Sequence, residues 1–246
     1  MKFSLLSNGK QNTKIGKNKN ENYLVFSLNL KPAQTEINGK IYNVCPFLTD
    51  GCKDSCVGTN GHFSMKNGSA YKAQVRRTNH YFNNTESFYI TLNEEIIKAK
   101  KQAKRKDSTA VFRLNAYSDI NHEKQSKRYL GQCIMSDNDD AIFYDYTKDE
   151  NKALTNNISN YYVTFSHNEN VTIEHSLSLL SKTNVAMVFE EIPNTFRGFP
   201  VYNGDLDDNR FLDPKGHIIA LKFKGSAKKR LDAISKGFCI PKNLLN

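Results

Sequence analysis

The chain has 246 residues, of which 38% are hydrophobic and 11% aromatic, so it is not a disordered protein and is long enough to bury a full core. No apolar run approaches the roughly 18 residues of a membrane-spanning helix, and no secretory leader is expected because the chain turns polar after Leu6; we therefore expect a cytoplasmic protein without a membrane partner. The formal net charge of +10 favours a polyanion such as DNA or RNA as partner.

Residues 1–22 are predicted to form a flexible N-terminal arm. Positions 7–22 consist almost entirely of Asn, Lys, Gly, Gln and Thr without a period, which is typical of an exposed segment. Folded structure is predicted to begin at Tyr23. Residues 23–246 are expected to form one α/β domain with a cysteine-rich loop at 45–61, because no linker divides them.

Six short apolar runs predict the strands of this domain. They are nearly continuous and β-rich, which suits strands buried on both faces of a parallel sheet. Helical periodicity over 69–82, 86–106 and Thr172–Lys182 predicts helices between them. We therefore predict a partial (βα) barrel or an open, mostly parallel sheet of about six strands, since a closed eight-stranded barrel needs more chain. The predicted strands are 23–30, 110–114, 141–144, 161–165, 185–189 and 218–221.

Three cysteines, Cys45, Cys52 and Cys56, follow the first predicted strand with the spacing C-x6-C-x3-C. Disulfides are disfavoured in the cytoplasm, so clustered thiols there favour a metal centre. One interpretation is an iron–sulfur cluster on three thiolates, with one iron open for catalysis. Another is a structural zinc with Cys133, Cys239 or His62 as the fourth ligand. Redox chemistry and ordinary burial of the thiols also stay open.

Polar side chains follow the predicted strands, where a parallel sheet collects its ligand-binding loops. We expect four of them to be catalytic: Asn115, Asp119, Lys148 and His167. Asp119 and Lys148 are the pair expected to meet a charged ligand, with an ordinary salt bridge between them as the alternative. Four more are expected to bind a cofactor: Arg113, Ser118, Ser166 and Glu190. All are predicted to share one rim with the thiols.

A second group of carboxylates follows the predicted strand 185–189. Asp205, Asp208 and Asp213, together with Asp119, would suit a hard cation and a metal-dependent nucleotide phosphoesterase. The turn-forming dipeptides Asn-Gly and Asp-Pro explain the same residues without a metal.

Basic residues cluster in three places. Six Lys and Arg stand in 98–106 at the end of a predicted helix, where they complement the helix dipole or contact phosphate. Arg76 and Arg77 lie near Tyr81 and Phe82, whose rings would stack on unpaired bases, and a third cluster lies in 222–230. Because Lys greatly outnumbers Arg, codon bias explains the charge equally well.

Several of these motifs together resemble a family of uncharacterised bacteriophage proteins, the gene product 88 group, over about residues 12–230. The resemblance implies a phage protein of the host cytoplasm without an assigned activity. The motifs are Cys45-Pro46, Gly51-Cys52, Cys56, Gly61, Arg113-Leu114-Asn115, Ser118-Asp119, Tyr144-Asp145-Tyr146-Thr147-Lys148, Thr164-Phe165-Ser166, Asn203-Gly204-Asp205 and Arg210-Phe211-Leu212-Asp213-Pro214-Lys215-Gly216.

More remotely, the cysteine loop and the polar strand ends are similar to the radical SAM superfamily. Its partial barrel binds a three-cysteine [4Fe–4S] cluster and S-adenosylmethionine, although it typically spaces the cysteines C-x3-C-x2-C. This resemblance implies an iron–sulfur enzyme of unknown substrate that uses S-adenosylmethionine. The alternative from the charge is a nucleic-acid-binding replication or host-takeover protein with structural zinc.

Overall fold

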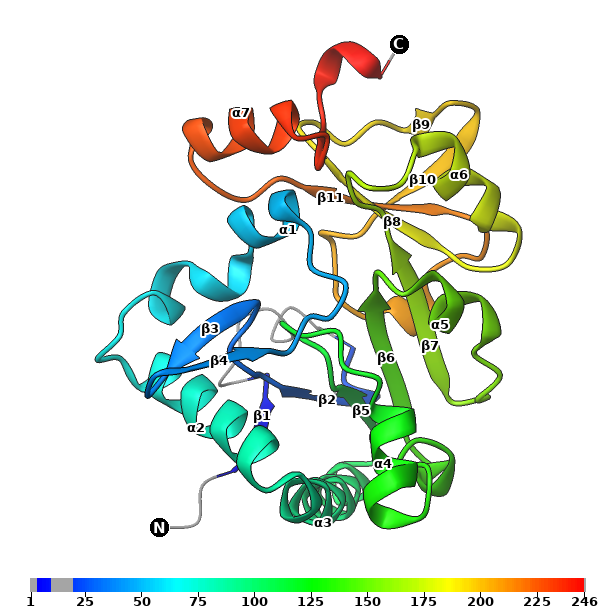
Figure 1. Cartoon of the computed structure of the whole chain (residues 1–246). Coiled ribbons are helices and arrows are strands. Elements are labelled where there is room, and N and C mark those ends of the chain that lie inside the picture. The colour runs from blue at the N-terminus through cyan, green and yellow to red at the C-terminus, as the bar shows by residue number, and fades with distance from the viewer. Residues whose placement is uncertain (1–3, 10–19, 246) are drawn as a thin grey trace. The chain divides into compact units, whose positions relative to one another are not determined.

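The computed structural model describes residues 4–9 and 20–245, and the chain divides into two compact units (Figure 1). Unit 1 comprises Met1–Pro46, Gly58–Asp145 and Asn157–Tyr162. Unit 2 comprises Phe47–Val57, Tyr146–Asn156 and Val163–Asn246. The chain passes between the units several times, so no single linker separates them.

The sheet of unit 1 is mostly parallel. Its hydrogen-bonded order is β1-β2-β5-β6, and only β1 runs antiparallel to its neighbour. A separate hairpin of β3 and β4 turns at Asn38 and Gly39, whose φ angles of 52° and 76° are typical of an Asn-Gly turn. The strands are β1 (Leu6–Asn8), β2 (Tyr23–Leu28), β3 (Gln34–Ile37), β4 (Lys40–Asn43), β5 (Thr109–Arg113) and β6 (Ile142–Thr147), whose last two residues belong to unit 2.

An aromatic row covers one face of this sheet. Phe26, Phe112 and Phe143 lie in register on three neighbouring strands, with ring centroids 5.6 and 5.1 Å apart. All three are buried, so this face forms the core of unit 1.

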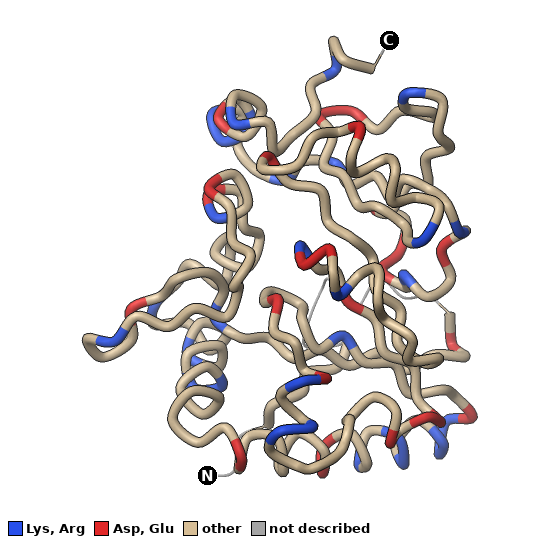
Figure 2. Tube along the Cα trace, turned by 45° about the vertical axis from the view of Figure 1, so that its right-hand side comes forward, with Lys and Arg blue, Asp and Glu red and all other residues tan. Residues whose placement is uncertain are grey.

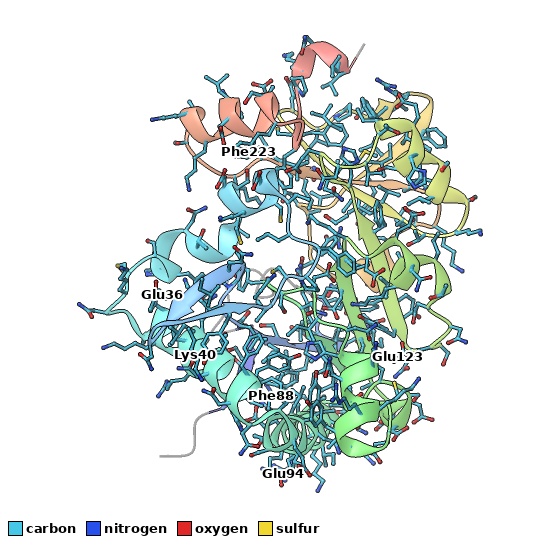
Figure 3. All side chains as sticks on the ribbon, in the orientation of Figure 1. Glu36, Lys40, Phe88, Glu94, Glu123 and Phe223 are labelled. Carbon is cyan, nitrogen blue, oxygen red and sulfur yellow. The ribbon has the colours of Figure 1, made fainter. Side chains whose placement is uncertain are left out.

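The longest helix of the described residues, α3 (Thr85–Lys104), begins where Asn84 accepts a hydrogen bond from Ser87 N. Phe88, Leu92 and Ile96 recur every four residues and are fully buried on its inner side. Figure 3 shows Phe88 on that side and Glu94 on the outer side. The other helical segments of this unit are α2 (Ser69–Asn83), α4 (His122–Leu130), η3 (Gly61–Phe63) and η4 (Ser136–Asn138).

The sheet of unit 2 follows the order β7-β8-β11-β10-β9, with β12 also paired to β8. All its pairs are parallel except β9 with β10. Buried residues such as Phe165, Met187, Phe189 and Ile218 form its core. The strands are β7 (Tyr161–Ser166, shared with unit 1), β8 (Val185–Phe189), β9 (Thr195–Phe196), β10 (Phe199–Asn203), β11 (Ile218–Lys222) and β12 (Cys239–Ile240).

The helices of unit 2 are short, and most of the longer ones carry a side-chain cap. Thr49, Asp149, Thr172 and Ser226 each accept a hydrogen bond from a backbone N–H of the first turn. The helices are α1 (Asp50–Asp54), α5 (Glu150–Thr155), α6 (Ile173–Ser178), α7 (Ala227–Ser235), η5 (Leu179–Ser181), η6 (Arg210–Leu212) and η7 (Lys242–Leu244). A further turn, η2 (Val57–Thr59), begins at the last residue of the segment Phe47–Val57 of unit 2 and continues into unit 1.

The predicted α/β class and the mostly parallel sheet are confirmed, as are the six predicted strands and three predicted helices. The number of strands was wrong: within the described residues the sheet has ten, and its order ends at β1 and β9 without closing into a barrel. Six short strands were missed: β1, β9, β10 and β12 of this sheet, and β3 and β4 of the separate hairpin.

The predicted arm is only partly covered by the structure. Leu6–Asn8 form β1, so this part is a strand rather than a loop, while 10–19 lie outside the described residues. The single domain over 23–246 stays a prediction. No helix in the described part of the chain is long and apolar enough to cross a membrane.

Candidate functional site

The sheet of unit 1 carries polar side chains on the face opposite the aromatic row. Successive residues of a strand point to opposite faces, so Ser27, Arg113 and Tyr144, each one position after a phenylalanine of the row, share the other face. Asn29 donates to Ser27 Oγ at 3.1 Å, and the Arg113 guanidinium lies 5.8 Å from the Tyr144 ring centre. We call these four residues the polar face; none is more than 4% exposed.

Asp145 organises the loop that follows β5. Its carboxylate accepts hydrogen bonds from Asn115 N at 2.6 Å, Asn115 Nδ2 at 3.2 Å and Tyr161 OH at 3.1 Å. Burial raises the pKa of Tyr161 well above its usual 10, so the phenol keeps the proton that it donates. Asn115 Oδ1 in turn accepts from Ser118 Oγ and Ile120 N. This network fixes the backbone of the loop that follows Arg113.

The remaining predicted residues of unit 1 lie on the same loop. Asp119 N donates to Val44 O at 2.9 Å, and Cys45 Sγ lies 3.6 Å from Tyr117 O. Five predicted site residues are thereby brought together in unit 1: Arg113, Asn115, Ser118, Asp119 and Cys45.

The other predicted polar residues belong to unit 2. Lys148 Nζ lies 3.5 Å from Ser166 Oγ, at the ends of β6 and β7. His167 Nδ1 lies 2.8 Å from Ser176 Oγ, and burial lowers the pKa of His167 to about 4, so the imidazole is neutral. Glu190 instead accepts from Lys242 N and holds the segment after β12. A rim that joins both sets, including an Asp119–Lys148 pair, stays a prediction.

Cys52 lies in α1, which is fixed tightly within unit 2. Glu169 accepts from Thr49 Oγ1 at 2.9 Å and from Gly51 N at 2.5 Å, and Lys236 Nζ binds Asp54 at 2.6 Å. A Cβ on Gly51 would lie only 2.5 Å from Phe238 Cβ. Only glycine fits at this position. The start of α1 is therefore fixed by its hydrogen bonds to Glu169 and by its close contact with Phe238.

Replacing Gly51 with Ala should therefore lower the free energy of unfolding by about 1–3 kcal/mol, because the added methyl group overpacks the contact with Phe238. Urea denaturation followed by circular dichroism measures the change. Lys53→Ala, an exposed position of the same helix, is the control and should stay within about 0.5 kcal/mol of wild type. A Gly51→Ala protein as stable as this control would contradict the packing.

The predicted metal centre finds no ligand set in the structure. Among residues 4–9 and 20–245, no group of three or more His, Cys, Asp or Glu side chains is arranged to hold a metal ion. Cys133 and Cys239 are buried, and burial raises the pKa of Cys239 to about 11, which favours a thiol over a ligating thiolate. The iron–sulfur cluster, the zinc site and S-adenosylmethionine stay predictions, which metal analysis of wild type and Cys52→Ala would test.

The carboxylates after β10 have basic partners. Arg210, 3% exposed, donates to Asp207 O at 2.6 Å and lies 3.2 Å from Asp213 Oδ2. Asp205 binds Lys224 Nζ at 2.6 Å. Burial raises the pKa of Asp213 to about 7, although Arg210 opposes this shift. Two of the predicted cation ligands, Asp205 and Asp213, thus lie beside a basic side chain, and the phosphoesterase stays a prediction.

One predicted nucleic-acid cluster lies only partly on the surface: Arg76 and Phe82 are exposed, whereas Arg77 and Tyr81 are not. Arg77 is buried and donates to Ser4 O and Ser7 Oγ, which ties β1 to α2. Tyr81 is also buried and packs against Phe88. Neither side chain is available to stack on a base.

The comparisons with known proteins agree with the motifs. A family model described as Gene product 88 matches residues 4–242. No curated protein and no solved structure matches the chain. The similarity to radical SAM enzymes therefore has no support from these comparisons. The match over nearly the whole chain shows that the protein belongs to the gene product 88 family.

Proposed function

We propose that the protein binds a small anionic molecule, one that carries a carboxylate or a phosphate, at the polar face of unit 1. The observation that supports this most is the burial of Arg113, 2% exposed, at the carboxyl end of β5. Ligands of parallel α/β sheets bind beyond the carboxyl ends of the strands. The guanidinium fork is suited to paired hydrogen bonds with carboxylate or phosphate oxygens.

The charge around this position favours an anion over a cation. Lys31, 6% exposed, follows β2 and lies 4.4 Å from the Tyr71 ring centre, so a second buried cation occurs at these strand ends. The buried carboxylate of β6, Asp145, accepts from Asn115 and Tyr161. With two cations and one carboxylate held in place, a ligand of negative charge is favoured.

Ser27, Asn29 and Tyr144 complete the chemistry of the polar face. Their hydroxyl and amide groups donate or accept, which suits the neutral polar groups of a ligand. Parallel strands covered on both faces usually carry apolar residues there. A buried polar row opposite an aromatic row is therefore evidence for binding rather than for packing.

The test is a thermal-shift and calorimetric titration with three anionic probes: inorganic phosphate, adenosine monophosphate and citrate. At least one should stabilise wild type, and Arg113→Lys should bind it at least tenfold more weakly because the fork is lost while the charge is kept. Arg128→Lys, an exposed arginine of α4, is the control and should bind like wild type. Failure of every probe to bind, or equal binding by Arg113→Lys, would refute the proposal.

A further inference from the structure

The excess positive charge is unevenly divided between the units. Unit 1 has 21 Lys and Arg against 12 Asp and Glu, a net +9, whereas unit 2 has 14 against 13, a net +1. Codon bias toward Lys acts on both units alike and does not account for the shortage of carboxylates in unit 1. In unit 2 many basic side chains are paired, as Lys224, Lys236 and Lys242 show.

Within the described residues of unit 1, the densest run of exposed basic residues lies at the end of α3. Lys98, Lys101, Lys104 and Arg105 are exposed, and we call them the α3 basic face. Helical spacing puts them on the side opposite the buried residues of the helix, the side on which Figure 3 shows Glu94. Figure 2 shows Lys and Arg positions, with Asp and Glu positions between them, along the lower end of the view, where Figure 1 places α3.

Lys100, which is also on α3, has a structural role within unit 1. Lys100 donates to Asn138 Oδ1 at 2.9 Å and pairs with Asp140 at 2.5 Å. Its ammonium therefore joins α3 to the segment before β6. The α3 basic face points the other way, and of its members Lys98 has a partner on the same helix, Glu94 at 3.7 Å.

The dimensions of the α3 basic face match a nucleic-acid backbone. Seven residues separate Lys98 from Arg105, about 10 Å along a helix. In a B-DNA duplex the phosphates of one strand recur about every 3.4 Å when measured along the duplex axis, so a face aligned with that axis spans about three of them. The face contains no aromatic ring, and contact with bases by stacking is therefore not expected.

A membrane surface fits less well. An interfacial helix needs a broad apolar side. The outer side of α3 exposes two large apolar residues, Ile90 at 47% and Ile97 at 40%. Two isoleucines form too narrow a stripe for insertion.

From these observations we propose that the α3 basic face binds the phosphate backbone of a nucleic acid without reading its sequence. This surface is independent of the anion proposed for the polar face. Each phosphate contact releases counterions, so the affinity should fall steeply with salt.

Fluorescence anisotropy with a 25-base-pair DNA duplex and a 25-nucleotide RNA, between 50 and 200 mM salt, tests the proposal. The triple variant Lys101→Ala/Lys104→Ala/Arg105→Ala should bind at least tenfold more weakly at the lowest salt. Its log–log salt slope on DNA should flatten by about two to three units, roughly 0.9 for each phosphate contact.

The matched control removes the same charge from unit 2 by Lys215→Ala/Lys228→Ala/Lys229→Ala, all exposed positions, and should bind like wild type. Thermal melting of all three proteins confirms that they fold. Equal losses in both triple variants, no binding by wild type at 50 mM salt, or binding to vesicles with 30% phosphatidylserine but not to nucleic acid would each overturn the proposal.

Discussion

Replacing Asp145 with Ala should lower the free energy of unfolding by about 3–5 kcal/mol, the range expected when a buried, hydrogen-bonded charge is removed. The carboxylate, 1% exposed, accepts from two nitrogens of Asn115 and from Tyr161 OH. Alanine leaves these buried donors without this acceptor. Because the chain has no Trp, circular dichroism in urea is the suitable measurement.

A double-mutant cycle separates the contribution of the tyrosine. Tyr161→Phe alone should cost about 1–2 kcal/mol, and its effect should nearly vanish in the Asp145→Ala background because the bond it removes is already gone. Additive losses, or an Asp145→Ala protein within about 1 kcal/mol of wild type, would show that the carboxylate does not hold this network.

The strands that were predictable are those that fill the core. A short apolar run such as 185–189 predicts a buried strand in an α/β chain. The stripe of Phe88, Leu92 and Ile96 has the period of a helix. The missed strands lack such a signal. β1 is three residues long and ends in a polar stretch, and β10 contains Pro200 between glycine-rich turns.

The candidate site was predictable only in outline. The rule that polar residues after parallel strands bind ligands found Arg113 and Asn115. Asp145 was noted only as part of a family motif and was given no role in the site, although a carboxylate inside the run Phe143-Tyr144-Asp145-Tyr146 is itself a signal of a specific buried partner. That partner, Tyr161, begins another strand, and only tertiary structure brings the two together.

The cluster around Arg77 shows how a predicted surface can include residues that the fold buries. Two arginines beside two aromatic residues indicate a surface for nucleic acid when only the sequence is considered. In α2, Arg77 and Tyr81 are four residues apart and therefore lie on the same side of the helix. That side is buried. Composition cannot distinguish these outcomes, because both need the same residue types.

Asp213 should make the stability of unit 2 depend on pH in the direction opposite to that of an ordinary ion-paired carboxylate. Burial raises the pKa of its folded-state carboxyl from the usual 3.8 to about 7. Between these values the folded protein binds more protons at this site than the unfolded chain does. The contribution of Asp213 to stability is therefore complete below about pH 4 and is lost as the pH rises through 7.

The Asp213→Asn variant isolates this contribution, because an amide keeps the shape and does not titrate. Relative to wild type, it should gain up to about 4 kcal/mol of unfolding free energy between pH 4 and pH 7.5, from about three pKa units at 1.36 kcal/mol each. Urea titrations at half-unit pH steps measure the difference. Asp205→Asn, which removes a carboxylate paired with Lys224 on the surface, is the control and should show no such gain. If the difference between wild type and Asp213→Asn stays constant over this range, the ion pair with Arg210 keeps Asp213 charged throughout and outweighs the effect of burial.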